Sequence, residues 1–81
     1  MKKILHVRYF AILREQRGLA QEQIETAAVT AVECYEELRG RHGFTLPADR
    51  LRVAVNDEFV PWGSPLGAGD TVVFSPPVAG G

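Results

Sequence analysis

The two residues best suited to carry chemistry are the last two of the chain, Gly80-Gly81. Neither has a Cβ, so the backbone there is narrow enough to carry a terminal carboxylate into a slot that would exclude any side chain. Before them, Val72-Val73-Phe74 reads as a strand that Pro76-Pro77 must end, because proline has no N–H for a ladder. Chain ends are often Gly-rich without meaning. Since a strand, a Pro-Pro stop and a terminal Gly-Gly coincide here, we interpret the carboxylate of Gly81 as the reactive group.

Other residues with reactive side chains are poor candidates. Cys34 lies beside the apolar stripe of a predicted helix, which favours a buried, inert thiol over a reactive one. His6 and His42 have no Cys or His at ligand spacing, so we expect no metal site, and a single cysteine excludes a four-cysteine iron–sulfur cluster. Asp57-Glu58 reads as a solvated turn, and the glycines of 63–69 lack the spacing and the lysine of a phosphate loop.

Length and composition predict one small domain spanning residues 1–81. The chain has 81 residues, 46% hydrophobic and 23% charged, which leaves too little room for both a core and a deep active site. A net charge of −1 gives no reason to expect nucleic-acid or membrane-surface binding, and no stretch is long enough to span a bilayer. One cysteine excludes an internal disulfide, which fits a reducing cytoplasm.

Hydrophobic periodicity predicts the elements that position the C-terminus. Thr30-Ala31-Val32-Glu33 is a capping box, and the helix that follows runs to about Arg41 with Val32, Tyr35 and Leu38 on its apolar stripe. A short helix follows Phe10 and stops at Gly18. Strands are predicted at 3–10, 20–25, 51–56, 58–60 and from Val72, with a loop containing one helical turn at 62–68.

This order is that of an α+β domain, and the β-grasp is its simplest arrangement. We therefore expect a mixed sheet packed on one main helix, with the first and last strands side by side in the centre. The last residues, about 75–81, are expected to form a flexible tail.

Several segments resemble the MoaD family, the small, sulfur-carrying subunits of molybdopterin synthase. These are Arg8–Glu15, Val55-Asn56, Pro65-Leu66 with Gly69-Asp70, and above all the terminal block Phe74–Gly81. The resemblance covers the whole chain, and the Pro-Pro-Val-X-Gly-Gly ending is its most specific part. It implies a ubiquitin-like β-grasp fold, in agreement with the predicted element order.

The resemblance also implies a carrier cycle in molybdenum cofactor biosynthesis. A MoeB-like adenylating enzyme would consume ATP to activate the carboxylate of Gly81, and a sulfur donor protein would convert it to a thiocarboxylate. The charged carrier would dock on a MoaE-like large subunit in a heterotetramer and give sulfur to cyclic pyranopterin monophosphate, which builds the molybdopterin dithiolene. By itself the chain would be no enzyme and would bind no cofactor.

Specific residues are implied to contact the partners. Gly80 would let the backbone enter the partner's active site, and Phe10, Phe59 and Phe74 match positions where the family places apolar residues. Ordinary core packing is the alternative for each phenylalanine. Ser75 departs from the family pattern, which has a bulky apolar residue there. The remaining predicted partner-binding residues belong to the tail: Pro76, Pro77, Val78 and Ala79.

Two other functions stay open from the sequence. Another sulfur carrier, serving thiamine synthesis, tRNA thiolation or ubiquitin-like tagging, would use the same terminus. A protein of a different class, a plain β-grasp interaction module, would carry an inert tail.

Overall fold

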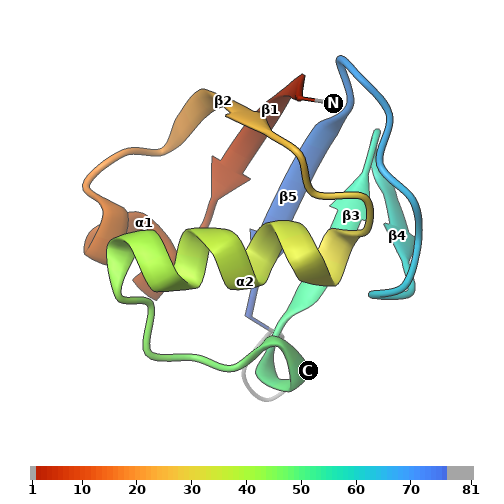
Figure 1. Cartoon of the computed structure of the whole chain (residues 1–81). Helices are drawn as coiled ribbons and strands as arrows, with labels where there is room; N and C mark the ends of the chain where they lie inside the picture. Colours follow the sequence, from red (N-terminus) through yellow and green to blue (C-terminus); the bar gives the residue numbers. More distant parts are fainter. Residues whose placement is uncertain (1, 77–81) are drawn as a thin grey trace.

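One five-stranded mixed sheet lies under one main helix in the computed structural model, which describes residues 2–76 (Figure 1). The elements, in chain order, are β1 (Lys3–Tyr9), α1 (Ile12–Arg17), β2 (Gln21–Thr26), α2 (Ala31–His42), the 3₁₀ turn η1 (Ala48–Arg50), β3 (Arg52–Val55), β4 (Glu58–Val60) and β5 (Thr71–Ser75). Every strand predicted from the sequence is present, with bounds shifted by one residue at most where both ends were predicted. The turn η1 was not predicted, and loop 62–68 contains turns but no helix.

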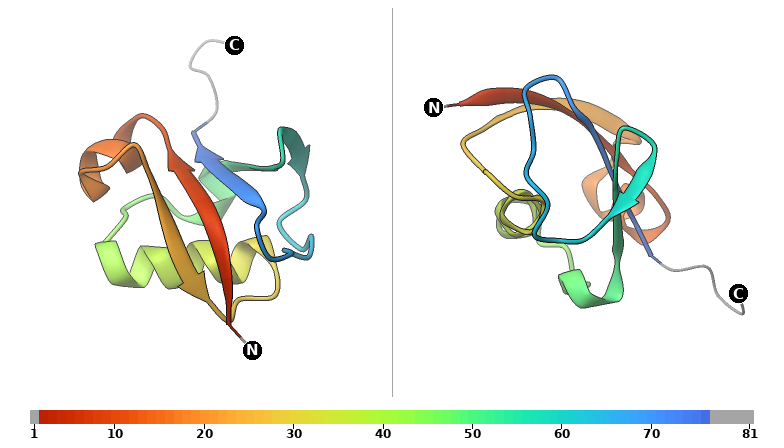
Figure 2. Two further views of the ribbon diagram at one scale, coloured as in Figure 1. Left: turned by 90° about the horizontal axis from the view of Figure 1, so that it is seen from above. Right: turned by 90° about the vertical axis from the view of Figure 1, so that its right-hand side faces the viewer.

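The strand order is β2-β1-β5-β3-β4, so the first and last strands of the chain lie side by side in the centre. β1 and β5 run parallel, whereas β1–β2, β3–β4 and β3–β5 are antiparallel. The predicted β-grasp arrangement is confirmed. Both views in Figure 2 show α2 on one side of the sheet only, which leaves the opposite face without a helix.

Two connections between elements depend on residues with positive φ: the one from α1 to β2 and the one from β3 to β4. α1 ends at Gly18, whose φ of 82° is left-handed and favours glycine, and the chain then returns as β2. Asn56 and Asp57 join β3 to β4 with φ values of 51° and 71°. Two successive positive φ angles match the twist of a tight hairpin, and Asn and Asp tolerate them better than most residues.

The N-terminus of α2 is held by the predicted capping box and by the loop before β5. Thr30 Oγ1 accepts from the Glu33 backbone N–H at 3.3 Å, and Glu33 Oε1 accepts from the Thr30 N–H at 3.2 Å. The carbonyls of Trp62 and Ser64 accept from the Val32 and Ala31 N–H groups at 2.9 and 3.0 Å. Loop 62–68 therefore supplies acceptors to a helix end that otherwise lacks them.

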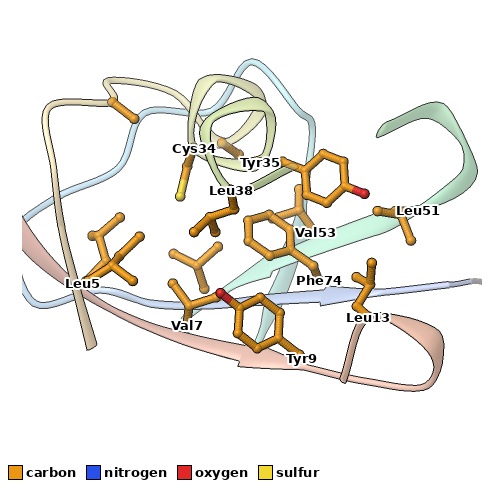
Figure 3. Close-up of a cluster of buried hydrophobic side chains, with 14 of the residues drawn as sticks. Leu5, Val7, Tyr9, Leu13, Cys34, Tyr35, Leu38, Leu51, Val53 and Phe74 are labelled. Carbon is orange, nitrogen blue, oxygen red and sulfur yellow. The ribbon is translucent and has the colours of Figure 1, made fainter. Parts of the chain in front are cut away.

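The core lies between α2 and the sheet (Figure 3). From α2, Cys34, Tyr35 and Leu38 are fully buried, whereas Val32 of the predicted stripe is half-buried. The sheet contributes alternate residues, among them Leu5, Val7, Tyr9, Val53, Val72 and Phe74. Because side chains alternate along a strand, the residues between these point to the open face.

Candidate functional site

The start of the predicted tail is fixed by the central strand β5. Phe74 is in register with Tyr9 of β1 on one side, and Ser75 with Arg52 of β3 on the other. Ser75 is thus the last residue of β5, so the strand includes the first residue of the tail predicted at about 75–81, and Pro76 after it is half-buried. The other predicted tail residues lie outside the described part of the chain: Pro77, Val78, Ala79, Gly80 and Gly81.

A row of side chains crosses the open face beside this point. Register places Arg8 next to Val73, Val73 next to Ala54, and Ala54 next to Phe59. With three neighbours they line an open hollow of about 350 Å³. We call this surface the open-face patch; its lining residues are Arg8, Phe10, Ala54, Asp57, Phe59, Val73 and Ser75. Because Ser75 belongs to the patch, the chain leaves the sheet at the edge of this surface.

The three phenylalanines predicted to contact partners do not share a surface. Phe10 and Phe59 are exposed, at 42% and 67%, and both line the open-face patch. Phe74 is 0% exposed and packs in the core against Tyr35 and Trp62. Its predicted role as a partner-contact residue is therefore wrong in this structure, because its register places it on the face that α2 covers.

Two arginines that the sequence interpretation missed lie over the aromatic rings of the patch: Arg8, which lines it, and Arg52, which lies beside it on β3. The guanidinium carbon of Arg8 lies 5.7 Å from the ring centroid of Phe10, and that of Arg52 lies 5.4 Å from the ring centroid of Phe59. Such cation–π contacts attract weakly at exposed sites. Arg8 alternates with the buried Val7 and Tyr9, so the strand period would have placed it on the exposed face.

The thiol of Cys34 is held unreactive. Burial, with a smaller contribution from the charge of Glu37, raises its pKa to about 12, so the nucleophilic thiolate is scarce near neutral pH. His42 lies near Glu22, with Nε2 3.9 Å from Oε2, and burial lowers the pKa of the histidine. Among residues 2–76, no group of three or more His, Cys, Asp or Glu side chains is arranged to hold a metal ion. None of the helices within that range is long and apolar enough to cross a membrane.

The patch is suited to binding rather than to chemistry. It offers aromatic rings, small apolar side chains and the guanidinium of Arg8 on a surface that is open and backed by the sheet, and the guanidinium of Arg52 lies over its Phe59. Large exposed aromatic residues on a rigid element are typical of protein-binding surfaces. Together with the sheet order, this defines a small ubiquitin-like β-grasp protein whose C-terminal strand ends beside an exposed surface that contains two phenylalanines.

Comparison with known proteins agrees with this class. Residues 7–81 match the ThiS family. The chain therefore belongs to the ThiS family of sulfur carriers, and the resemblance to the MoaD family stated from the sequence is confirmed. The chain is 35% identical over 81 residues to the molybdopterin synthase sulfur carrier subunit of Haemophilus influenzae, a match that covers 96% of this chain and 100% of the relative.

Solved structures show the same fold. The putative molybdopterin converting factor subunit 1 of Pyrococcus furiosus is 31% identical with a TM-score of 0.79, over 94% of this chain and 99% of the other. SAMP1 of Haloferax volcanii is 26% identical with a TM-score of 0.77, over 96% and 99%. The complex of subunits 1 and 2 of the molybdopterin-converting factor of Helicobacter pylori contains a chain that is 26% identical with a TM-score of 0.65, over 96% and 99%.

Proposed function

We propose that this protein is the sulfur-carrying small subunit of a molybdopterin synthase. The observation that carries the proposal is the similarity to the H. influenzae sulfur carrier subunit, which extends over nearly the whole of both chains. The similarity to a putative molybdopterin converting factor subunit in P. furiosus supports it. The fold adds that the chain's last strand lies at the sheet centre and ends at an exposed patch.

The proposed reaction takes place at the carboxylate of Gly81. A free carboxylate is a poor electrophile, so a MoeB-like enzyme attaches AMP from ATP, with release of pyrophosphate. A sulfur donor protein then supplies sulfur at the sulfide level: a C–S bond forms at the carbonyl carbon of Gly81, the C–O bond to AMP breaks, and AMP leaves a thiocarboxylate behind. In the synthase this sulfur forms a C–S bond to cyclic pyranopterin monophosphate, and water cleaves its bond to the carbonyl carbon, which restores the carboxylate of Gly81. Two such transfers supply the dithiolene. ATP is consumed by the activating enzyme, the carrier binds no cofactor of its own, and the reactions take place in the cytoplasm.

The proposed partner in the last step is a MoaE-like large subunit, in a heterotetramer. The H. pylori complex of subunits 1 and 2 supports this choice, because one chain of that complex has the same fold and aligns with 96% of this protein. The open-face patch is the proposed contact surface, with Phe10 and Phe59 as anchors. Because proline fixes φ, Pro76 and Pro77 limit the entropy lost when the tail enters the partner.

Two measurements test the proposal. The gene is expressed in a bacterium that lacks its own small subunit, and molybdoenzyme activity is assayed. In parallel, the purified protein is incubated with the activating enzyme, ATP and a sulfur source, and its mass is determined. We expect restored activity and a mass gain equal to the exchange of one oxygen for sulfur at Gly81. A thiocarboxylate without complementation would identify a carrier of another pathway. If the chain neither gains a thiocarboxylate nor restores activity, it is an interaction module with an inert tail.

A carrier of another pathway is the second candidate, because SAMP1 of H. volcanii is similar at a TM-score of 0.77. Thiamine synthesis, tRNA thiolation and ubiquitin-like tagging would each use the same terminus. Protein conjugates recovered with this chain attached through Gly81 would favour tagging over sulfur transfer.

A further inference from the structure

We propose that Arg8 and Arg52 determine which partner the open-face patch accepts, and that the large-subunit surface covering the patch presents carboxylates to both guanidiniums. This inference rests on the proposed function, since the occupant it names is the large subunit of molybdopterin synthase. It concerns a feature that the aromatic residues alone do not explain, which is the placement of two cations on an otherwise largely apolar surface.

The two arginines bracket the central strand. Arg8 on β1 is in register with Val73, and Arg52 on β3 is in register with Ser75. Strand spacing of about 4.8 Å and a rise of about 3.3 Å per residue place their Cα atoms roughly 12 Å apart across β5. Each guanidinium lies above an exposed phenylalanine of the patch, Phe10 or Phe59. A partner that contacts both rings must therefore also cover or displace both cations.

Neither guanidinium is neutralised within the described chain. Arg17, Arg39 and Arg41 form ion pairs with glutamates, but within residues 2–76 neither Arg8 nor Arg52 forms one. Covering an unpaired guanidinium removes its hydration at a large cost unless the partner supplies acceptors. Carboxylates fit this need best, because they accept two parallel hydrogen bonds from one guanidinium. A neutral or basic partner surface is disfavoured for the same reason.

A second copy of this chain fits the patch less well than an acidic partner. The patch is lined by one arginine, Arg8, and one carboxylate, Asp57, and Arg52 adds a second cation over Phe59, so two copies would bring like charges together. The large subunit fits better under the proposed function, because it must hold the carrier while the tail that follows Ser75 occupies its active site. We therefore assign the two carboxylates to the large subunit, and the activating enzyme is tested separately by adenylation of every variant.

Charge reversal tests the inference. Arg8→Glu, Arg52→Glu and the double variant are compared with wild type for binding to the large subunit encoded by the same genome, by calorimetry at low and high salt. Arg41→Glu is the matched control, because Arg41 makes an exposed ion pair on α2, which covers the opposite face (Figure 1). We expect each patch reversal to weaken binding roughly 10-fold or more, and the double variant to lose much of the salt dependence. The control should stay within about 2-fold of wild type.

Thermal melts and adenylation assays accompany every variant, and Arg8→Gln and Arg52→Gln replace any reversal that does not fold. Equal affinity and equal salt dependence of the patch variants and wild type would overturn the inference and leave the proposed function intact. The inference would also be overturned if the glutamine variants bound the large subunit more tightly than wild type, or if the variants lost adenylation by the activating enzyme and kept their affinity for the large subunit. Failure of the wild-type chain to bind the large subunit would overturn the proposed function and this inference with it.

Discussion

Phe59 and Phe74 show how a single residue's register decides its role. Both belong to the same sheet, yet Phe59 is 67% exposed and Phe74 is fully buried. Phe59 registers with Ala54 on the open face, whereas Phe74 registers with Val53, which points to α2. A mutation should therefore separate binding from folding at these two positions.

Replacing Phe59 with Asp should weaken binding to the large subunit by about 2 kcal/mol or more, because an exposed aromatic anchor at the centre of an interface commonly contributes that much. The free energy of unfolding should change by less than about 1 kcal/mol, since the side chain is exposed on an edge strand. Binding calorimetry and urea denaturation measure the two quantities. Val29→Asp is the control, because Val29 is 58% exposed outside the patch. An equal loss of stability and binding would place Phe59 among the structural residues.

Replacing Phe74 with Ala should have the opposite effect. The ring packs against Tyr35 at a centroid distance of 5.2 Å and stacks on Trp62 at 5.9 Å. Its removal leaves a core cavity and should lower the free energy of unfolding by about 3–5 kcal/mol. Urea denaturation measures the change, with Phe74→Leu as a milder variant for which the loss should be smaller. A loss below about 1 kcal/mol combined with weakened partner binding would restore Phe74 to the docking surface.

At the scale of elements, the sequence predicted what local patterns determine. The capping box of Thr30 and Glu33, the alternation of β1 and the Asn56-Asp57 turn each act over a few residues, and each was read correctly. Val72-Val73-Phe74 is apolar throughout, so no alternation indicated which face Phe74 occupies; pairing with β1 and β3 decided it. The turn η1 has three residues, too few for a periodic signal. The open-face patch is formed by residues of four strands, so it depends on how these strands pair, and no single segment of the sequence carries that information.

Glu22 of β2 links three elements that the sequence could not connect. Its carboxylate accepts from Tyr9 Oη of β1 at 2.7 Å and from Arg17 Nε and Nη2 of α1, both at 2.8 Å. The hydrogen bonds from Arg17 are the largest cause that holds the pKa of Glu22 below its ordinary value of 4.5. Burial and the adjoining Glu22 raise the pKa of Tyr9, so this phenol remains a hydrogen-bond donor at neutral pH.

Glu22→Gln should therefore destabilise the fold in a pH-dependent way. Because the folded-state pKa is lowered, the stabilisation is fully present above the unfolded value near 4.5 and is lost as the pH falls through the folded value. Near neutral pH the variant should lose about 1–2 kcal/mol, as expected for hydrogen bonds to a charged group. Urea denaturation of both proteins from about pH 7 to about pH 3 measures the difference, which should shrink below 4.5. A difference constant over the whole range would show that ionisation of Glu22 contributes nothing.

At the scale of the whole molecule, the fold fixes the beginning of the segment whose last residue, Gly81, is the proposed site of reaction. β5 is hydrogen-bonded on both sides, to β1 and to β3, so Ser75 and Pro76 start from a fixed position beside the open-face patch. The span from Pro76 to Gly81 is short, at most about 20 Å at roughly 3.3 Å per residue. Under the proposed function, chain length links docking at the patch to delivery of the terminus, and a change in that length should affect transfer without affecting the fold.

Appending one alanine after Gly81 should abolish sulfur transfer. The added residue converts the carboxyl of Gly81 into an unreactive amide and moves the new carboxylate about 3.5 Å further along the chain. A reacting atom must lie within about 3–3.5 Å of its attacking partner, so a shift of this size removes it from the productive position. The melting temperature should not change, because the addition follows the last strand. Mass spectrometry after incubation with activating enzyme, ATP and a sulfur source measures thiocarboxylate formation, with the unextended chain as control. If the extended protein exchanged oxygen for sulfur as fast as its parent, Gly81 would not be the specific site, and the carrier hypothesis would lose its central residue.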